Sequence, residues 1–154
     1  MPPHPLILID TNVAYTYLTG RDDPYLENVQ EIIHLCAMNM LQGFIALHSL
    51  SNIWFIARKI PSNIRRAWLL DLCTILTVIG TNHANVIAAI QNEQFADFED
   101  CLQDKCAKEA NCDFIVTANL KDFTVSEIPA ISPDEFLKIL KDYLGSEVES
   151  DEQT

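Results

Sequence analysis

The chain has 154 residues, of which 22 are acidic and 10 are basic, and its net charge is −12. This length suits one domain with a sizeable core. The excess of negative charge argues against tight non-specific binding to nucleic acid, although a local basic patch can coexist with it. No apolar run reaches the roughly 18 residues of a membrane span. We expect no secretory signal and no membrane contact, and therefore a cytoplasmic protein.

Predicted strands and helices alternate along the chain. Residues 6–9 are uninterrupted aliphatic residues, which is typical of a buried parallel strand. The other predicted strands span residues 44–47, 75–79, 113–117 and 130–131. The predicted helices span residues 12–19, 24–41, 49–59 (capped by Ser49 or Ser51), 63–73, 83–92, 97–110 and 133–144.

This alternation predicts an α/β fold, a three-layer α/β/α sandwich with a five-stranded parallel sheet. We expect a single domain over residues 1–144. Residues 145–154 are rich in acidic side chains and have few apolar ones, so we expect an acidic, disordered tail there.

The cysteine pattern bears on the cellular compartment. The chain has five cysteines, an odd number, and no C-x-x-C motif. Small buried hydrophobic residues in a reducing cytoplasm explain this pattern best, and a zinc site or structural disulfides are the alternatives. The five are Cys36, Cys73, Cys101, Cys106 and Cys112.

Acidic and polar residues follow two of the predicted strands. Asp10 comes directly after the first strand, and Thr117, Asn119 and Asp122 come after the fourth. In open α/β sheets, ligands bind in the crevice beyond the carboxyl ends of the strands. If the two strands are neighbours, these side chains share one crevice, where a divalent cation could pair with the carboxylates.

A third acidic site opens the helix predicted over 97–110. Asp97, Asp100 and Asp104 share one face of it by their spacing. The helix dipole accounts for an acid at Asp97, whereas Asp100 lies beside apolar Cys101 and needs another explanation. With Asp10 and Asp122, these acids could hold Mg²⁺ or Mn²⁺ and support phosphodiester hydrolysis, with Thr117 orienting a carboxylate or a water.

Four of the ten basic residues, Arg58, Lys59, Arg65 and Arg66, lie within nine positions. They form either a solvated surface or a strip that contacts phosphates beside the acidic site. Trp54 and Phe55 precede them, and these aromatic residues serve either core or dimer packing or the stacking of bases.

Four segments of the chain resemble the PIN domain family. They are ILIDTN at 7–12, HSLSNIWFIARK at 48–59, DFEDCLQDKCAKEANCDFIVTANLKDF at 97–123 and ISPDEFLKIL at 131–140. The resemblance implies the α/β/α fold. It also implies a Mg²⁺- or Mn²⁺-dependent ribonuclease that cleaves RNA, and many bacterial and archaeal members are toxins paired with an antitoxin. PIN proteins often form homodimers.

The resemblance also assigns site residues. The first family acid falls on Asp10, the third on Asp100, and the fourth region on Asn119 and Asp122. The second acid, usually a Glu, falls on Asn52, which offers a neutral oxygen in place of a carboxylate. Asp97 or Asp122 could compensate for this loss of charge.

Three hypotheses follow from the sequence. The first is a toxin-like endoribonuclease whose metal is held by Asp10, Asp100, Asp122 and Asp97. The second is a degenerate PIN scaffold that binds RNA or a protein partner without cutting. The third is a phosphotransferase with Asp10 as its nucleophile, although such enzymes of the haloacid-dehalogenase type carry a second Asp where this chain has Asn12.

Overall fold

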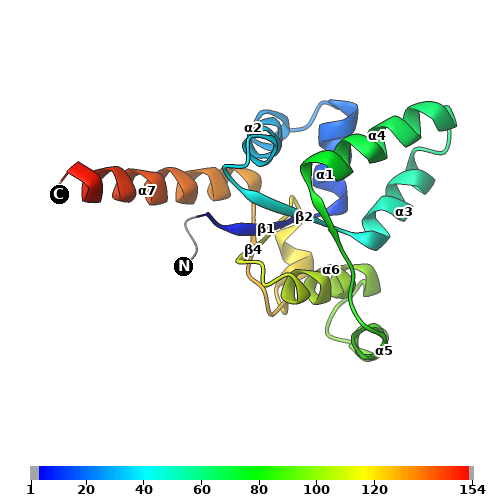
Figure 1. Ribbon diagram of the computed structural model, residues 1–154. Coiled ribbons are helices and arrows are strands. Elements are labelled where there is room, and N and C mark those ends of the chain that lie inside the picture. Colours follow the sequence, from blue (N-terminus) through cyan, green and yellow to red (C-terminus); the bar gives the residue numbers. More distant parts are fainter. Residues whose placement is uncertain (1–3, 153–154) are drawn as a thin grey trace.

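The structure is a computed structural model that describes residues 4–152, so residues 153 and 154 of the predicted tail lie outside the described part. Five parallel strands form one sheet in the order β3-β2-β1-β4-β5. This confirms the predicted five-stranded parallel sheet (Figure 1). The strands are β1 (Leu6–Ile9), β2 (Gln42–Ala46), β3 (Thr77–Ile79), β4 (Phe114–Val116) and β5 (Ala130–Ile131).

Helices cover both faces of the sheet, as predicted for a three-layer sandwich. Figure 1 shows α2 and α6 on opposite sides of β1 and β2. The helices are α1 (Thr11–Thr19), α2 (Leu26–Ala37), α3 (Leu47–Ile56), α4 (Ser62–Ile75), α5 (His83–Gln91), α6 (Phe98–Glu109) and α7 (Pro133–Glu152), with a 3₁₀ turn η1 (Leu120–Phe123).

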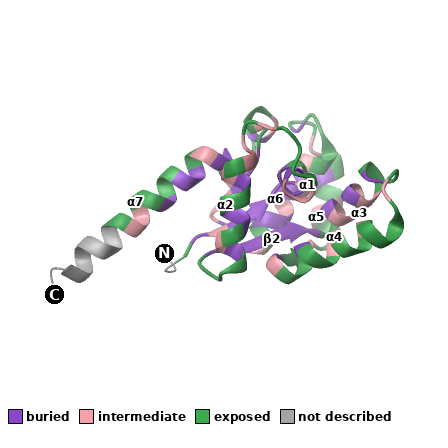
Figure 2. Ribbon diagram, turned by 90° about the horizontal axis from the view of Figure 1, so that it is seen from above, coloured by how far each residue is buried: buried purple, intermediate pink, exposed green. Residues whose placement is uncertain are grey.

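The alternation of side chains along each strand builds two cores. Ile7 and Ile9 of β1 pack in one cluster with residues of α1, α2 and α7, whereas Leu8 packs in the other with residues of α6. Successive strand residues point to opposite faces, so a continuous aliphatic strand fits between two helical layers. Figure 2 shows the buried sheet in the centre and a largely exposed α4 at the edge of the molecule.

Several predicted boundaries differ from the structure. The second helix was predicted to reach Leu41, but α2 ends at Ala37 and Asn39 adopts a positive φ of 59°. The second strand begins two residues earlier than predicted and includes Gly43, where a Cβ would lie 2.5 Å from Leu76 Cδ2 and 2.9 Å from Cys36 Sγ. Gly43 therefore permits a close helix–strand contact and does not itself end the helix.

The start of α3 is also different. Neither Ser49 nor Ser51 caps this helix, because it begins at Leu47 directly after β2 and its N-cap is Ala46. Ser49 is fully buried in the first turn of the helix, where its hydroxyl contacts other side chains. The boundary between the next helix and strand shifts as well, since α4 runs to Ile75 and β3 starts at Thr77.

The last helix extends further than predicted. We expected it to end near Gly145, but α7 continues to Glu152. One glycine costs a helix interior only about 1 kcal/mol, so Gly145 alone does not stop it.

The prediction that the cysteines are small buried residues is confirmed for four of them. Cys36, Cys101, Cys106 and Cys112 are buried, Cys73 is exposed, and all five are free thiols. Within residues 4–152, no helix has the length and apolar character needed to cross a membrane.

Candidate functional site

Asp10 lies at the carboxyl end of β1 and caps α1. Its backbone N–H donates to the carbonyl of Val116 in β4 at 3.0 Å, which holds the ends of the two strands side by side. Its side-chain Oδ1 accepts a hydrogen bond from the N–H of Thr11 at 2.8 Å. The carboxylate is 5% exposed, so the fold places an acid in a nearly closed position.

Thr117 connects the two strand ends. Its hydroxyl is fully buried, donates to Asp10 Oδ2 at 2.9 Å and accepts from the backbone N–H of Asn119 at 3.0 Å. Burial raises the pKa of Asp10, while the hydrogen bonds from Thr117 and Thr11 lower it. The hydroxyl thus favours the charged carboxylate and fixes its orientation.

Asp100 faces the same space from the first turn of α6. Burial is the largest cause that raises the pKa of its carboxyl, to about 7, and the next causes are the nearby charges of Asp10, Asp97, Asp122 and Glu99. Like charges this close disfavour ionisation. The structure therefore brings together acids that are up to 112 positions apart in the sequence, as the pattern of strand ends predicted.

These residues line one open pocket of about 350 Å³. Its polar lining comes from the ends of β1 and β4, from α3 and from the start of α6. Among the described residues, no Lys, Arg or His lines it. The lining residues are Asp10, Thr11, Asn12, Asn52, Phe55, Ile56, Asp97, Glu99, Asp100, Gln103, Asn119 and Asp122.

Two members of the predicted helix face have other roles. Asp97 is the N-cap of α6, and its Oδ1 accepts from the N–H of Glu99 at 2.8 Å, although it also borders the pocket. Asp104 is outside the pocket, because its buried carboxylate accepts from the backbone N–H groups of Glu127 and Ile128, each at 3.0 Å. Asp104 therefore anchors a loop.

The structure adds two residues that sequence reasoning missed. Glu99 lines the pocket and its Oε2 accepts from Asn52 Nδ2 at 3.0 Å. Gln103, only 2% exposed, donates through Nε2 to Thr11 Oγ1 at 3.0 Å and to Ser49 Oγ at 2.7 Å. Its Oε1 is buried without a hydrogen-bond partner. No local sequence pattern signalled either residue, because both roles depend on partners distant in the sequence.

The donor set suits a hard cation. Carboxylate and amide oxygens are the ligands that Mg²⁺ and Mn²⁺ prefer, and the pocket has several of each. Over residues 4–152, however, no three Asp, Glu, His or Cys side chains converge closely enough to form a ready-made cation cluster. A bound cation would have to draw the carboxylates together.

The parallel sheet, the two helical layers and the acids at the strand ends define the class of α/β/α proteins with an acidic crevice at the carboxyl edge. Within this class, the model of the family described as PIN domain matches residues 6–121. The chain belongs to the PIN domain family. No curated protein matches the chain.

Two solved structures are similar to this fold. VapBC2 from Rickettsia felis, solved bound to a DNA fragment from their promoter, matches with a TM-score of 0.64 and 15% identity over 82% of this chain and 98% of that one. VapC20 from Mycobacterium tuberculosis, described as a sarcin-ricin loop cleaving toxin, matches with a TM-score of 0.59 and 15% identity, over 82% and 99%. At this identity the likeness concerns the fold alone.

Proposed function

We propose that this protein is a metal-dependent endoribonuclease, a toxin-like PIN protein that hydrolyses RNA phosphodiester bonds. The observation that carries the proposal is the convergence of five acids, Asp10, Asp97, Glu99, Asp100 and Asp122, in one pocket without a basic lining residue. Burial and these neighbouring charges raise the pKa of Asp100. Such a group of carboxylates is unfavourable alone and favourable around a divalent cation. Membership of the PIN family supports the same reading.

The residues divide into two roles. Asp10, Asp100 and Asp122 would hold Mg²⁺ or Mn²⁺, with Asp97 and Glu99 adding charge at the rim. When bound, a divalent cation activates the attacking water and neutralises charge on the phosphate. Thr117 keeps the Asp10 carboxylate oriented, and Asn52 and Asn119 position water or substrate by hydrogen bonds.

The overall reaction is a hydrolysis. The oxygen of water bonds to phosphorus and the bond to the 3′ oxygen breaks, so that the products carry a 3′-hydroxyl and a 5′-phosphate. The proton of the water can pass to a carboxylate at the rim of the pocket that does not bind the cation, such as that of Glu99.

The direct test is cleavage of a single-stranded RNA with Mn²⁺, comparing the wild type with Asp10→Asn. The matched control is Asp142→Asn, an exposed carboxyl on α7. We expect loss of cleavage only in Asp10→Asn. Equal cleavage by all three proteins would overturn the proposal.

One observation favours a second candidate, a PIN scaffold that binds RNA or a protein without cutting. Asn52 is neutral where most family members carry an acid, and its amide is already engaged with Glu99. Calorimetry with Mn²⁺ separates the two candidates. A binding isotherm that disappears in Asp10→Asn supports the nuclease, and its absence in the wild type supports the scaffold.

We also propose an antitoxin partner and a homodimer, in a reducing cytoplasm. The likeness to VapBC2 supports the partner. Apolar side chains that the fold leaves uncovered on α4, such as Leu70 at 67% and Ile64 at 41% exposure, support a protein interface there. Light scattering on the purified chain tests the dimer.

A further inference from the structure

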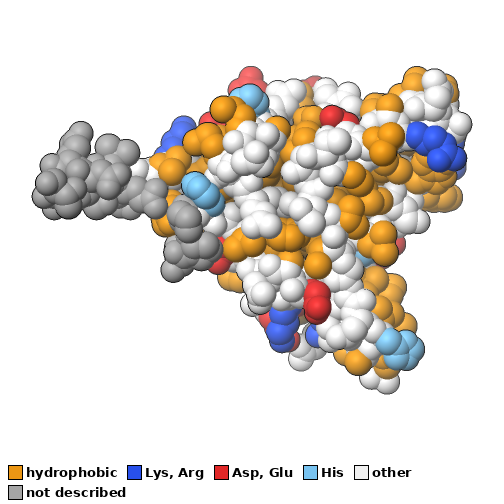
Figure 3. All heavy atoms as spheres, viewed as in Figure 1, with side chains coloured by type: hydrophobic (Ala, Val, Ile, Leu, Met, Phe, Trp, Pro, Cys, Tyr) orange, Lys and Arg blue, Asp and Glu red, His pale blue; other side chains and the backbone are white. Residues whose placement is uncertain are grey.

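Among the described residues, the basic side chains of the turn after α3 and near the start of α4 are not paired with carboxylates. In the described part of the chain the ion pairs are Lys108 with Glu127 and Lys138 with Glu135, although 22 acidic residues are available. Figure 3 shows Lys and Arg side chains gathered at the end of the molecule where α3 and α4 meet. The positive charges of Arg58, Lys59, Arg65 and Arg66 are therefore not neutralised by ion pairs within the described residues, on an otherwise acidic protein.

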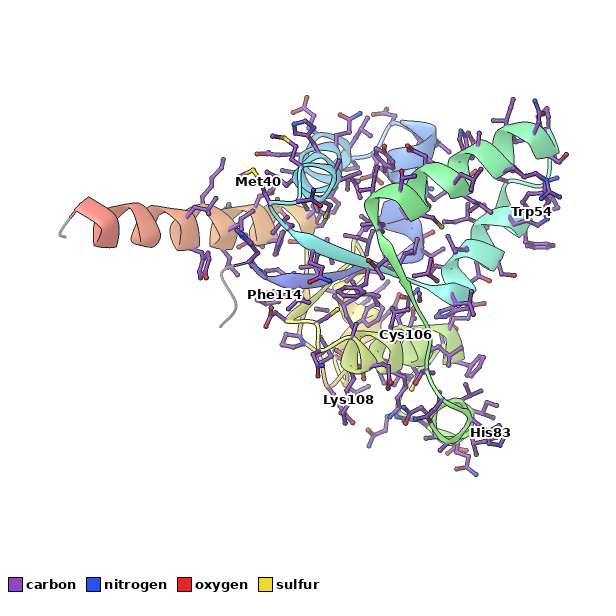
Figure 4. The ribbon with its side chains drawn as sticks, viewed as in Figure 1. Met40, Trp54, His83, Cys106, Lys108 and Phe114 are labelled. Atoms are coloured by element: carbon purple, nitrogen blue, oxygen red, sulfur yellow. The ribbon has the colours of Figure 1, made fainter. Side chains whose placement is uncertain are left out.

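One of the four residues has a structural role. The Arg65 guanidinium lies 3.8 Å from the ring centroid of Trp54 and donates to the carbonyls of Ile60 and Trp54. Figure 4 places Trp54 at the turn between α3 and α4. Arg65 therefore holds this turn in place, and it is not available for a ligand.

Arg58 is placed differently, beside the acidic pocket. Its guanidinium lies 4.6 Å from the ring centroid of Phe55, and its Nη1 donates to the Phe55 carbonyl at 3.2 Å. Phe55 itself lines the acidic pocket and is 65% exposed. A large aromatic ring that is mostly exposed at the rim of a polar pocket, with a cation beside it, is a candidate surface for binding a ligand.

A second hollow lies next to the acidic pocket, at the end of α3. This hollow, of about 350 Å³, is bordered by Tyr15, Ile56, Arg58 and Lys59 among others. Ile56 borders both hollows, so they adjoin. Phe55 at the rim of the acidic pocket thus contacts Arg58, which borders the second hollow together with Lys59.

We propose that Phe55, Arg58 and Lys59 form a binding track for single-stranded RNA that leads into the acidic pocket. An unpaired base stacks on Phe55, and the next phosphates contact Arg58 and Lys59. Stacking of this kind needs a base with a free face, which a duplex does not offer. The inference rests on the proposed function for the class of substrate, but it assigns residues and a strand preference that the carboxylates alone do not give.

Binding can be measured without cleavage in the Asp10→Asn background. The probes are a fluorescent 12-nucleotide RNA and the same RNA as a blunt duplex, followed by anisotropy in Mg²⁺. We expect Phe55→Ala to weaken single-strand binding at least about fivefold, with Phe55→Trp restoring it and Phe55→Leu not. The matched control is Ile90→Ala, an apolar side chain 62% exposed on α5.

Charge is tested by Arg58→Ala/Lys59→Ala against Lys138→Ala/Lys141→Ala, which removes the same two charges from α7. We expect only the first pair to weaken binding, and to reduce the slope of log affinity against log salt by about 1 to 1.5. Equal effects of both pairs, full binding by Phe55→Leu, or equal affinity for duplex and single strand would each overturn the track.

The outcomes also separate the track from the nuclease proposal. The track variants are also made in the wild-type background. If they still cleave RNA and their KM is unchanged, the track is rejected and the nuclease proposal stands. Strand-specific binding that depends on Phe55, in a wild type that does not cleave RNA, keeps the track and rejects the nuclease.

Discussion

The side-chain amide of Asn52 on α3 donates to the carboxylate of Glu99 in the first turn of α6, with 3.0 Å between Nδ2 and Oε2. The resemblance to the PIN family predicts an acid at position 52. Here the neutral side chain holds a carboxylate from another helix at the rim of the pocket. The chain thus regains at Glu99 a negative charge that it lacks at Asn52.

We therefore predict that Glu99→Gln lowers the Mn²⁺-dependent cleavage of RNA by roughly tenfold, the lower range for groups that orient metal ligands. Asn52→Ala should lower it by a similar factor, because Glu99 loses its donor. The double variant should be no worse than either single one. The measurement is kcat/KM at fixed Mn²⁺, with exposed Glu93→Gln as the control. Additive losses would show that the two residues act separately.

A second prediction concerns the site acids and the pH dependence of the free energy of unfolding. Burial and neighbouring acids raise the pKa of Asp100 to about 7, above the roughly 3.9 of an unfolded chain. The folded state then binds this proton more tightly than the unfolded state does. The stabilisation is complete below the unfolded pKa and is lost as pH rises through about 7.

Without metal, Asp100→Asn should therefore melt a few degrees higher than the wild type at pH 8, and this advantage should shrink at pH 5. Thermal unfolding in EDTA at both pH values gives the comparison, with Glu93→Gln as the control. Mn²⁺ should stabilise the wild type more than Asp100→Asn at pH 8. A variant that is destabilised equally at both pH values would contradict the prediction.

The site residues that could be predicted from the sequence share one property: a local sequence pattern indicates where each of them lies in the fold. Asp10 follows an aliphatic strand and Asp100 lies at a helix start, and both signals are local. Glu99 and Gln103 owe their roles to partners 47 to 92 positions away, which no single-sequence pattern reports. The same limit explains the wrong prediction for Ser49. Serine is a residue type that often caps helices, but this one instead contacts Thr11 and Gln103.

Thr117 gives a third prediction. Thr117→Val keeps the shape of this buried side chain and removes the donor to Asp10 Oδ2. We expect a loss of about 1–3 kcal/mol in the free energy of unfolding, since the bond is to a charged group. The pKa of Asp10 should rise further, because the hydroxyl favours its ionised form.

Because of this change, the acid limb of the pH–rate profile should move to higher pH in Thr117→Val. The control is Thr117→Ser, which keeps the hydroxyl and should keep the limb in place. A profile that is unchanged in Thr117→Val would show that Asp10 does not titrate in the active form.

Gln103 gives the fourth prediction. It joins α6 to Thr11 of α1 and Ser49 of α3, and these helices carry or adjoin the site acids. Gln103→Leu removes both hydrogen bonds but leaves the 2.7 Å contact between the Thr11 and Ser49 hydroxyls. We expect a loss of about 1–2 kcal/mol in the free energy of unfolding and a fall in kcat, because Asp100 lies one turn away on α6.

A matched variant separates positioning from packing. Gln103→Glu keeps the size of the side chain but adds a buried charge beside Asp100, so its destabilisation should be larger at pH 8 than at pH 5. Ser49→Ala combined with Gln103→Leu should lose less free energy of unfolding than the sum of the two single changes, because they share one hydrogen bond. Strictly additive losses, together with an unchanged kcat in Gln103→Leu, would mean that the residue fills space without positioning the helix that carries Asp100.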